Sequence, residues 1–585
     1  MSDKILSVKN LSVKFTTEDE VVTAVNNLSF EIKKKEIFAI VGESGSGKSV
    51  TAQTILGLCG RKENEHINGI INFFNNDKEI NILELDNDEK RKIRGRHISM
   101  IFQEPMTSLH PLYTIKQQLT ESINVHKETL KNENIDIIID SLNKVQIPNP
   151  EKVLNLYPHN LSGGMRQRIM IAMAILFKPK ILIADEPTTA LDVTIQDQIL
   201  NLLKLLVDEI GMSIMFITHD MSVVSEMADK ILVMKKGQLI ENNTVSSIFN
   251  KPEHEYTKGL IKAVPVFGNY KKNKDRDSFY ENNNEILLSI DNLSKYYYQQ
   301  SGLFNKKNII TKAVDNVSLK IFKGSTFSLV GESGCGKTTV ARCLMNLIKA
   351  DKGNIFFDNN NLESLNSKEL ISKRKEIQMI FQDPYASLNP RMPVNKIVIE
   401  ALEIHKIIKN KMNYEVALNL LNDVKLDSSF LNRYPHELSG GQRQRLCIAR
   451  ALAMKPKLIV ADEPISSLDV TIQAQIIDLI LELQNKYKLS IFFISHDIAV
   501  VEKISHYVGV MCRGKLVEYG RTLDVLHDPQ HEYTKCLINS VPTIESNIKN
   551  KKKKYSLGLD GYYSSIELGT RGEYVNLKND HFYLT

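Results

Sequence analysis

The chain has 585 residues, about four times the ~150 residues typical of one domain, so a single compact core is excluded and a modular protein is expected. Hydrophobic residues make up 42% and charged residues 25%, which excludes a mostly disordered or collagen-like polypeptide. The net charge of +6 is small for this length, so composition gives no reason to expect a nucleic-acid partner.

Neither a membrane span nor a signal peptide is expected. The longest uninterrupted apolar run covers residues 169–177, well short of the roughly 18–20 residues that a spanning helix requires. The opening MSDKILSVKN has no apolar segment behind a basic stretch. The six cysteines are scattered without a CxxC pair, which favours reduced thiols in the cytosol over disulfides or a zinc site.

The sequence contains the same set of motifs twice. Over residues 157–199 and 434–476, 28 of 43 positions are identical without a gap. We therefore place a first domain at 1–265 and a second at 285–542. Between them, GNYKKNKDRDSFYENNN (266–284) is interpreted as a solvated polar linker, and the lysine-containing segment 543–585 as a loosely ordered tail.

Each half begins with an apolar run that leads into a glycine-rich loop and then a helical pattern. This is the context of a phosphate-binding loop, in which backbone N–H groups at a helix N-terminus converge on phosphate oxygens. Lys48 and Lys337 are predicted to reach the terminal phosphates, and the hydroxyls of Ser49 and Thr338 to join a Mg²⁺ shell. The remaining loop residues are Gly42, Glu43, Ser44, Gly45, Ser46 and Gly47, and Gly331, Glu332, Ser333, Gly334, Cys335 and Gly336.

Further along each half, an apolar run ends in ADEP. Asp185 and Asp462 are predicted to bind the metal, because ligands collect at the carboxyl ends of parallel strands. The following residues, Glu186 and Glu463, are placed to accept a proton from an attacking water or to orient it.

A second apolar run in each half ends in FITHD or FISHD. An isolated histidine is more often structural, but His219 and His496 each follow the acid by 33 residues, which favours contact with the γ-phosphate or the water.

The motifs LSGGMRQR and LSGGQRQR precede helical patterns and predict exposed helix N-termini that can hold an anion. Within one domain each would be a second phosphate site without a ligand, which points to use by a partner domain.

Both halves contain the same motifs in the same order: phosphate loop, glutamine after an apolar run, LSGG, ADE, LD and histidine. The glutamines are Gln103 and Gln382, and the aspartates of LD are Asp192 and Asp469. This series resembles the nucleotide-binding domain of ABC-type ATPases. The resemblance implies two tandem P-loop NTPase domains of α/β class, each with a RecA-like core, a helical subdomain and an antiparallel β subdomain. It implies ATP and Mg²⁺ as cofactors, with Gln103 and Gln382 contacting metal or water.

The resemblance also implies that the two halves pair head to tail within one chain. The ATP at Lys48 would be completed by the second signature and the ATP at Lys337 by the first. An aromatic residue stacks on adenine in this family; Phe15 matches, as does Tyr297, although Tyr296 or Tyr298 could serve instead. The signature residues are Ser162, Gly163, Gly164 and Met165, and Ser439, Gly440, Gly441 and Gln442.

Finer motifs, including YPHNLSGG, YPHELSGG and the trailing HEYTKGLIKAVP and HEYTKCLINSVP, resemble the ATPases of bacterial dipeptide and oligopeptide importers, including the fused microcin C-type and glutathione-type members. The resemblance implies an ATPase on the cytoplasmic face of the cell membrane. Its partners would be two integral-membrane permease subunits and an extracytoplasmic solute-binding protein.

Two other classes of ATPase fit the motifs less well. A tandem ATPase that acts on ribosomes lacks these tails, and a DNA-repair ATPase would require cysteine-rich zinc insertions. The solute stays open among dipeptides, oligopeptides, glutathione, peptide antibiotics, nickel and opines.

Overall fold

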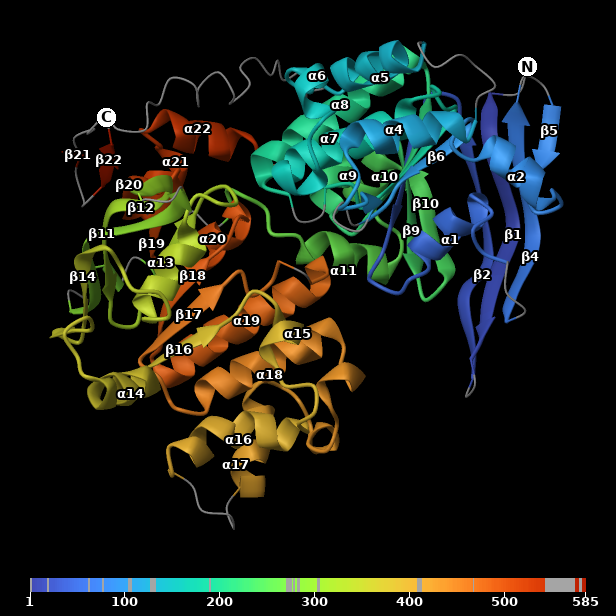
Figure 1. Cartoon of the computed structure of the whole chain (residues 1–585). Coiled ribbons are helices and arrows are strands. Elements are labelled where there is room, and N and C mark those ends of the chain that lie inside the picture. The colour runs from blue at the N-terminus through green and yellow to red at the C-terminus, as the bar shows by residue number, and fades with distance from the viewer. Residues whose placement is uncertain are drawn as a thin grey trace.

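Each half is built on a mixed core sheet whose central strand leads into the glycine-rich loop. The computed structural model describes residues 3–17, 20–60, 64–75, 78–103, 108–126, 133–188, 191–269, 276, 279–280, 285–301, 306–407, 413–466, 468–541, 574–577 and 581–584. Figure 1 shows the first half in blue to green and the second in yellow-green to red, side by side.

The first core sheet has the order β10-β9-β3-β8-β7-β6. Its strands pair in parallel except for β10, which is antiparallel to β9. All five residues of β3 are buried, as expected for a strand covered on both faces. The bounds are β3 (Ile37–Val41), β6 (Ile98–Ile101), β7 (Ile181–Asp185), β8 (Ser213–Thr218), β9 (Lys230–Lys235) and β10 (Gln238–Thr244).

An antiparallel sheet of order β2-β1-β4-β5 packs against this core, and both contribute to one hydrophobic cluster. Its strands are β1 (Lys4–Thr16), β2 (Val21–Lys33), β4 (Glu65–Asn75) and β5 (Lys78–Asn81). The helices of the first half are α1 (Lys48–Ile55), α2 (Asn87–Ile93), α4 (Ile115–Asn124), α5 (Glu133–Lys144), α6 (Pro150–Val153), α7 (Gly163–Ile175), α8 (Val193–Ile210), α9 (Met221–Met227), α10 (Val245–Asn250) and α11 (Glu255–Ala263).

Helices α4 to α7 form a separate helical layer at one side of the core (Figure 1). Ile115, Leu119 and Ile123 recur every fourth residue along α4, so they lie on one face of the helix, and all three are buried. The Thr114 side chain accepts a hydrogen bond from the N–H of Gln117 and so fixes the start of this helix. The expected α/β fold with helical and antiparallel β subdomains is confirmed.

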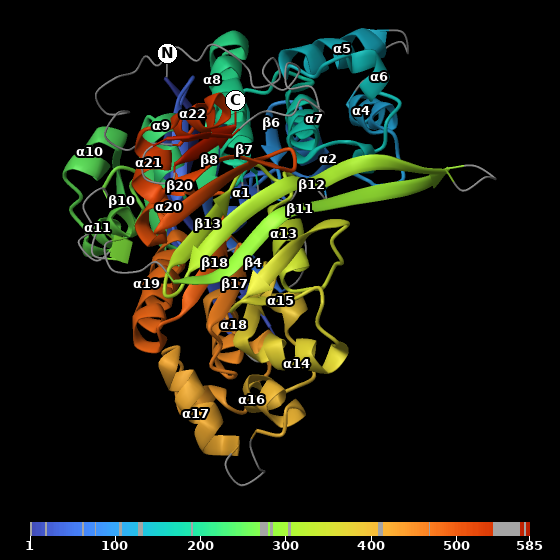
Figure 2. The same cartoon turned by 90° about the vertical axis from the view of Figure 1, so that its left-hand side faces the viewer.

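The second half repeats this architecture. Its antiparallel sheet has the order β12-β11-β14-β15 and its core sheet the order β16-β17-β18-β13-β19-β20-β22-β21. The strands β11 and β12 form a long curved ribbon (Figure 2). The bounds are β11 (Ile286–Ser301), β12 (Lys306–Phe322), β13 (Thr326–Val330), β14 (Lys352–Phe357), β15 (Asn360–Asn361), β16 (Ile377–Ile380), β17 (Leu458–Asp462), β18 (Ser490–Ile494), β19 (Tyr507–Cys512), β20 (Lys515–Arg521), β21 (Tyr574–Asn576) and β22 (Phe582–Leu584).

The helices of the second half follow the same chain order. They are α13 (Lys337–Leu344), α14 (Ser367–Glu376), α15 (Pro384–Ser387), α16 (Val394–Ile404), α17 (Asn413–Asp423), α18 (Gly440–Leu452), α19 (Val470–Tyr487), α20 (Ile498–Ile504), α21 (Thr522–His527) and α22 (Glu532–Asn539). None of the helices within the described ranges combines the length and apolarity needed to span a bilayer.

The described residues of the linker and tail segments make contacts that the sequence did not predict. In the expected solvated linker, Arg276 is buried and donates a hydrogen bond of 2.6 Å to the carbonyl of Glu502, while the hydroxyl of Tyr280 donates to the carbonyl of His506. In the expected loose tail, β22 pairs with β20, and the buried His581 contacts Glu518 at 2.7 Å. Long-range contacts with the second half, which composition does not encode, order these residues.

Candidate functional site

The glycine-rich loops wrap around the lysines that open α1 and α13. Lys48 Nζ donates to the carbonyls of Gly42 and Glu43 at 2.7 and 2.8 Å. Lys337 Nζ donates to the carbonyls of Gly331 and Glu332 at 2.7 and 2.9 Å. Burial lowers the pKa of Lys48, against the opposing effect of nearby carboxylates. Each lysine is thus held inside its loop, in position to meet an anion.

Glycine is required where each loop turns into its helix. Gly47 and Gly336 are the N-caps of α1 and α13, with φ of 98° and 110°. A Cβ at Gly47 would lie 2.4 Å from the Ala24 carbonyl oxygen, and one at Gly336 would lie 2.0 Å from that of Ala313. The loop therefore packs too closely against the β subdomain to admit a side chain.

The predicted metal ligands converge at both loops. Ser49 Oγ donates to Asp185 Oδ1 at 3.2 Å, and Thr338 Oγ1 donates to Asp462 Oδ1 at 3.0 Å. Burial raises the pKa of Asp185 to about 6, although the Ser49 hydroxyl opposes the shift, and burial likewise raises the pKa of Asp462. A hydroxyl and a buried carboxylate this close form an oxygen donor set that suits Mg²⁺.

The next acid in each half is contacted by the predicted glutamine and histidine, and the three residues form a triad. Gln103 Nε2 donates to Glu186 Oε2 at 3.0 Å, and His219 Nδ1 lies 3.1 Å from Glu186 Oε1. Burial alone would lower the pKa of His219, but the hydrogen bond and charge of Glu186 outweigh it and raise that pKa.

The second half has the same triad with one looser contact. Gln382 Nε2 donates to Glu463 Oε2 at 2.8 Å, whereas His496 Nδ1 lies 3.7 Å from that oxygen. Burial acts to raise the pKa of Glu463, but His496 outweighs it and lowers that pKa. The pKa of His496 is raised, since Glu463 outweighs burial.

Both acids sit in a backbone conformation that side chains rarely adopt. Glu186 has φ of 48° and Glu463 has φ of 44°. Each backbone N–H is held by the neighbouring strand, through the carbonyl of Ile217 at 2.8 Å and that of Ile494 at 3.1 Å. Strained residues persist where the surrounding structure fixes them, and they cluster at functional sites. The strain turns each carboxylate off its strand toward the glutamine and histidine.

The two halves contact each other at these loops. The Ser44 N–H donates to Asp469 Oδ2 at 3.0 Å, and the Ser333 N–H donates to Asp192 Oδ1 at 2.6 Å. Asp469 and Asp192 are the N-cap residues of α19 and α8. Each phosphate loop is therefore bonded to the loop that follows the acid in the opposite half, a reciprocal arrangement.

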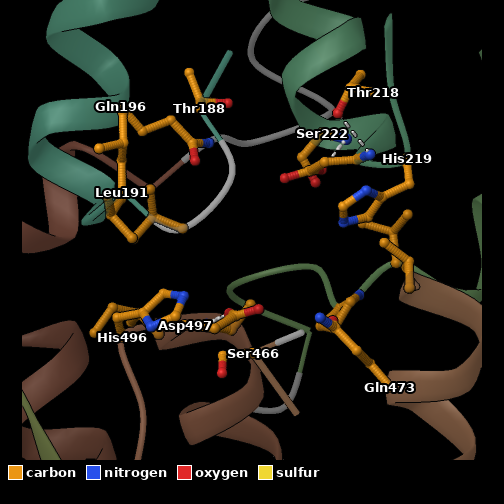
Figure 3. Close-up of a pocket in the computed structure, with 18 residues that line it drawn as sticks. Thr188, Leu191, Gln196, Thr218, His219, Ser222, Ser466, Gln473, His496 and Asp497 are labelled. Atoms are coloured by element: carbon orange, nitrogen blue, oxygen red, sulfur yellow. Dashed lines mark hydrogen bonds between the residues drawn. The ribbon is translucent and has the colours of Figure 1, made fainter. Parts of the chain in front are cut away.

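A cavity of about 150 Å³ lies between the halves and is lined by both. Figure 3 shows His219 and Ser222 of the first half facing Ser466, His496 and Asp497 of the second. The two predicted histidines thus border one shared space, which places both triads beside the interface.

The signature serines begin helices, as predicted. The Ser162 side chain accepts from the N–H of Met165 at 3.3 Å, and that of Ser439 accepts from the N–H of Gln442 at 3.4 Å. Gly163 and Gly440 are the first residues of α7 and α18. These helix N-termini are exposed, which leaves them accessible to a partner.

The candidate adenine-stacking residues occupy the antiparallel sheets. Phe15 in β1 is partly buried against the first core, and Tyr297 in β11 is exposed. The hydroxyl of Tyr296 donates to Asp315 Oδ1 at 2.7 Å, which turns that ring toward the sheet, whereas Tyr298 is exposed. The choice among Tyr296, Tyr297 and Tyr298 stays a prediction.

Sequence reasoning missed four residues at the loops. The hydroxyls of Tyr256 and Tyr533 accept hydrogen bonds from the backbone N–H groups of Glu43 and Glu332. Thr471 and Thr194 donate to the carboxylates of those same glutamates from the opposite half. The sequence does mark these residues, because the tyrosines lie in the repeated HEYTK stretch and the threonines in the repeated LDVTIQ stretch. Repetition alone, however, does not show which residues they contact.

Comparison with known proteins defines the class. The ABC transporter family model matches residues 25–189 and 314–466, and the model for the C-terminal region of oligopeptide/dipeptide transporters matches 240–285 and 517–558. The chain belongs to the ABC transporter family, as an ATP-binding importer subunit with two ATPase domains that bind and hydrolyse ATP. The alternative of a tandem ATPase acting on ribosomes has no support.

Particular relatives are similar over nearly the whole chain. The glutathione import ATP-binding protein GsiA of Escherichia coli (strain K12) is 44% identical over 598 residues, covering 98% of this chain and 94% of that protein. GsiA of Pectobacterium atrosepticum is 44% identical over 577 residues, covering 94% and 91%. Among solved structures, the dimeric ATP-binding cassette MJ0796 bound to ADP and Pi is 30% identical, covers 41% of this chain and 99% of that chain, and has a TM-score of 0.36.

Proposed function

We propose that this chain powers the import of glutathione or a similar short peptide from the cytoplasmic face of the cell membrane. The observation that carries the proposal is the 44% identity to glutathione import ATP-binding proteins over 98% of the chain. Both halves also carry the oligopeptide/dipeptide transporter region, which favours a peptide-like solute over nickel or an opine.

In this proposal each half supplies the groups for one hydrolysis event. Glu186 and Glu463 accept a proton from the attacking water, and the glutamines and histidines that contact them hold the carboxylates in place. Lys48 and Lys337 neutralise phosphate charge. Mg²⁺ would neutralise charge on the phosphates. Its ligands would be Ser49, Asp185 and Gln103 in the first half, and Thr338, Asp462 and Gln382 in the second.

We further propose that each ATP is shared between one phosphate loop and the signature of the other half. The reciprocal hydrogen bonds of Asp469 with Ser44 and of Asp192 with Ser333 support this head-to-tail pairing. In this pairing Ser439 to Gln442 complete the site of Lys48, and Ser162 to Met165 that of Lys337.

Membrane permease subunits would dock beside the glutamines. Phe102 and Phe381, which precede Gln103 and Gln382, are 44% and 40% exposed. Beside Phe102 lies a groove of about 280 Å³ whose apolar lining includes Val125 and Met173. Exposed apolar side chains around a groove indicate a protein-binding site, and contact there would link permease motion to the Gln103–Glu186 hydrogen bond.

Uptake of labelled solute by a deletion strain tests this function. We expect the intact chain to restore uptake of glutathione or a short peptide, and a Glu186→Gln/Glu463→Gln chain, expressed to the same level, to fail. Unlabelled glutathione, dipeptides, oligopeptides and Ni²⁺ serve as competitors and identify the solute. Restored uptake of Ni²⁺ alone, or unchanged peptide uptake after deletion, would overturn the peptide assignment.

A further inference from the structure

The first turn of α11, and likewise of α22, presents a tyrosine hydroxyl to the phosphate loop of its own half. Tyr256 Oη accepts from the Glu43 N–H at 3.4 Å, and Tyr533 Oη accepts from the Glu332 N–H at 3.1 Å. Both tyrosines belong to the oligopeptide/dipeptide transporter region rather than to the segments matched by the ABC transporter model. A region outside the matched ATPase segments therefore contacts both nucleotide loops.

The start of each of these helices is fixed to the core sheet. Glu241, which is buried in β10, accepts hydrogen bonds from the N–H groups of Glu253 and His254 at 3.1 and 3.3 Å. His254 Nδ1 then accepts from the Tyr256 N–H at 3.0 Å. In the second half Glu518, His531 and Tyr533 repeat these bonds. The tyrosine ring thus projects from an anchored backbone.

The same loop residue is also bonded to the opposite half. The Glu43 carboxylate accepts from Thr471 Oγ1 at 3.3 Å, and the Glu332 carboxylate accepts from Thr194 Oγ1 at 2.5 Å. Helix α11 lies beside α19 (Figure 1), and Leu260 shares a hydrophobic cluster with Val470. Each loop is therefore bonded on one side to its own C-terminal helix and on the other to the neighbouring half.

We propose that Tyr256 and Tyr533 are positioning residues that hold the phosphate loops in the shape that receives ATP. Glu43 and Glu332 lie in the loops, before the turns into α1 and α13. Their N–H groups donate to the tyrosines. The N-termini of α1 and α13 are then left to bind phosphate. Burial raises the pKa of Tyr256 to about 12, so its hydroxyl stays neutral. This inference extends the ATPase activity and does not depend on the transported solute.

The two tyrosines differ in their surroundings. Tyr533 is fully buried among the core residues of the second half, whereas Tyr256 is partly buried and lies below Lys235 Nζ, 4.4 Å from the ring centre. Loss of a hydrogen-bond partner costs more at a buried site than at a partly exposed one, because water cannot take its place at the buried site. We therefore expect the second loop to depend more on its tyrosine than the first.

Single hydroxyl deletions in the full chain test the proposal. Tyr256→Phe is made with Lys337→Ala, so that the first loop alone binds nucleotide, and Tyr533→Phe is made with Lys48→Ala. Titration with a non-hydrolysable fluorescent ATP analogue should show the dissociation constant rising about five-fold, as for one lost hydrogen bond, and more for Tyr533→Phe. The control, Tyr487→Phe, removes a hydroxyl that contacts Asp423 at the surface and should change nothing.

Steady-state hydrolysis, measured without the lysine substitutions, separates positioning from other roles. The KM for ATP should rise while kcat stays within about two-fold, because the hydroxyl acts before the chemical step. Unchanged dissociation constants in both variants would overturn the proposal. So would a fall in kcat at constant KM, or a lower melting temperature without weaker binding, since these assign the hydroxyl to catalysis or to packing alone.

Discussion

At the scale of single residues, the two candidate sites bring together the same five residue types, and the distance of the histidine contact differs between them. Gln103 and Gln382 hold their glutamates at 3.0 and 2.8 Å, but the histidine contact is 3.1 Å in the first half and 3.7 Å in the second. Both sites contain the predicted lysine, aspartate, glutamate, glutamine and histidine. Because this set is complete in both halves, both sites are expected to hydrolyse ATP.

Glu186→Gln and Glu463→Gln, made separately, measure this equivalence. Each change keeps the side-chain shape and removes the proton acceptor, so each should reduce turnover at its own site by about 100-fold or more. Steady-state ATPase assays should show a substantial loss in both variants. Loss of nearly all turnover in one variant and of almost none in the other would contradict two equivalent sites.

The glycines that end each phosphate loop provide a steric prediction. Gly47→Ala and Gly336→Ala place a Cβ within 2.4 and 2.0 Å of carbonyl oxygens and should reduce nucleotide affinity by at least about ten-fold, since the backbone must move. Gly324→Ala is a matched control, because Gly324 also has a positive φ of 72° but has no atom within 4 Å of the added Cβ. Equal affinity losses in the loop variants and the control would show that backbone strain, and not close packing, is responsible.

At the scale of elements, strand ends explain why residues far apart in the sequence could be predicted to lie close together. Asp185 and Asp462 end β7 and β17, and His219 and His496 follow β8 and β18, as apolar runs ending in polar residues predicted. Parallel strands that share a sheet bring those ends together. The repeated order of the motifs then allowed each half to confirm the other.

What sequence could not provide were contacts between elements far apart in the chain. Arg276 lies in a polar stretch without periodicity, yet it is buried and donates a hydrogen bond to a carbonyl of α20. Strand β22 has no counterpart among the described strands of the first half, so no repeat predicted its pairing with β20. Tyr256 and Tyr533 recur in register, but only the fold shows that their hydroxyls meet the loops.

Strand β13 depends on a histidine where the first half has an acid. His506 Nδ1 accepts from the Thr326 N–H at 3.0 Å, as Asp229 accepts from the Ile37 N–H in the first half. Burial, with Arg276, lowers the pKa of His506 from 6.5 to about 4. Between these values the unfolded chain binds the proton and the folded chain does not, so stability is complete above about pH 6.5 and is lost as pH falls toward 4.

Unfolding of the His506→Asn variant tests this pH dependence. Asparagine keeps an acceptor for the Thr326 N–H but does not titrate. On acidification, the free energy of unfolding should therefore fall by up to about 3 kcal/mol less in the variant than in the wild type. Denaturant unfolding of the second half between about pH 7 and pH 4.5 measures it. His66→Asn, at an exposed site in β4, is the control. Parallel pH profiles for the His506 variant and the wild type would contradict the assignment.

At the scale of the whole molecule, the two halves are connected directly at their nucleotide loops. Asp469 and Thr471, at the start of α19, bond Ser44 and Glu43, and Asp192 and Thr194 do the same for the second loop. We therefore expect a change in either loop to shift the first turn of a helix in the other half. Fusion of both halves in one chain keeps these reciprocal contacts at a high effective concentration.

We expect these contacts to make the two sites cooperative, and Asp192→Ala/Asp469→Ala should remove that cooperativity. Both substitutions delete a charged acceptor of a loop N–H, and each such hydrogen bond contributes about 1.5 kcal/mol or more, so turnover should fall about ten-fold and the Hill coefficient for ATP should approach one. Asp478→Ala is the matched control, because Asp478 lies on α19 but pairs with Lys503 at 2.6 Å and does not contact a loop. A double variant with wild-type turnover and Hill coefficient would show that the halves communicate by another route, whereas a loss shared by the control would assign the effect to helix α19 as a whole.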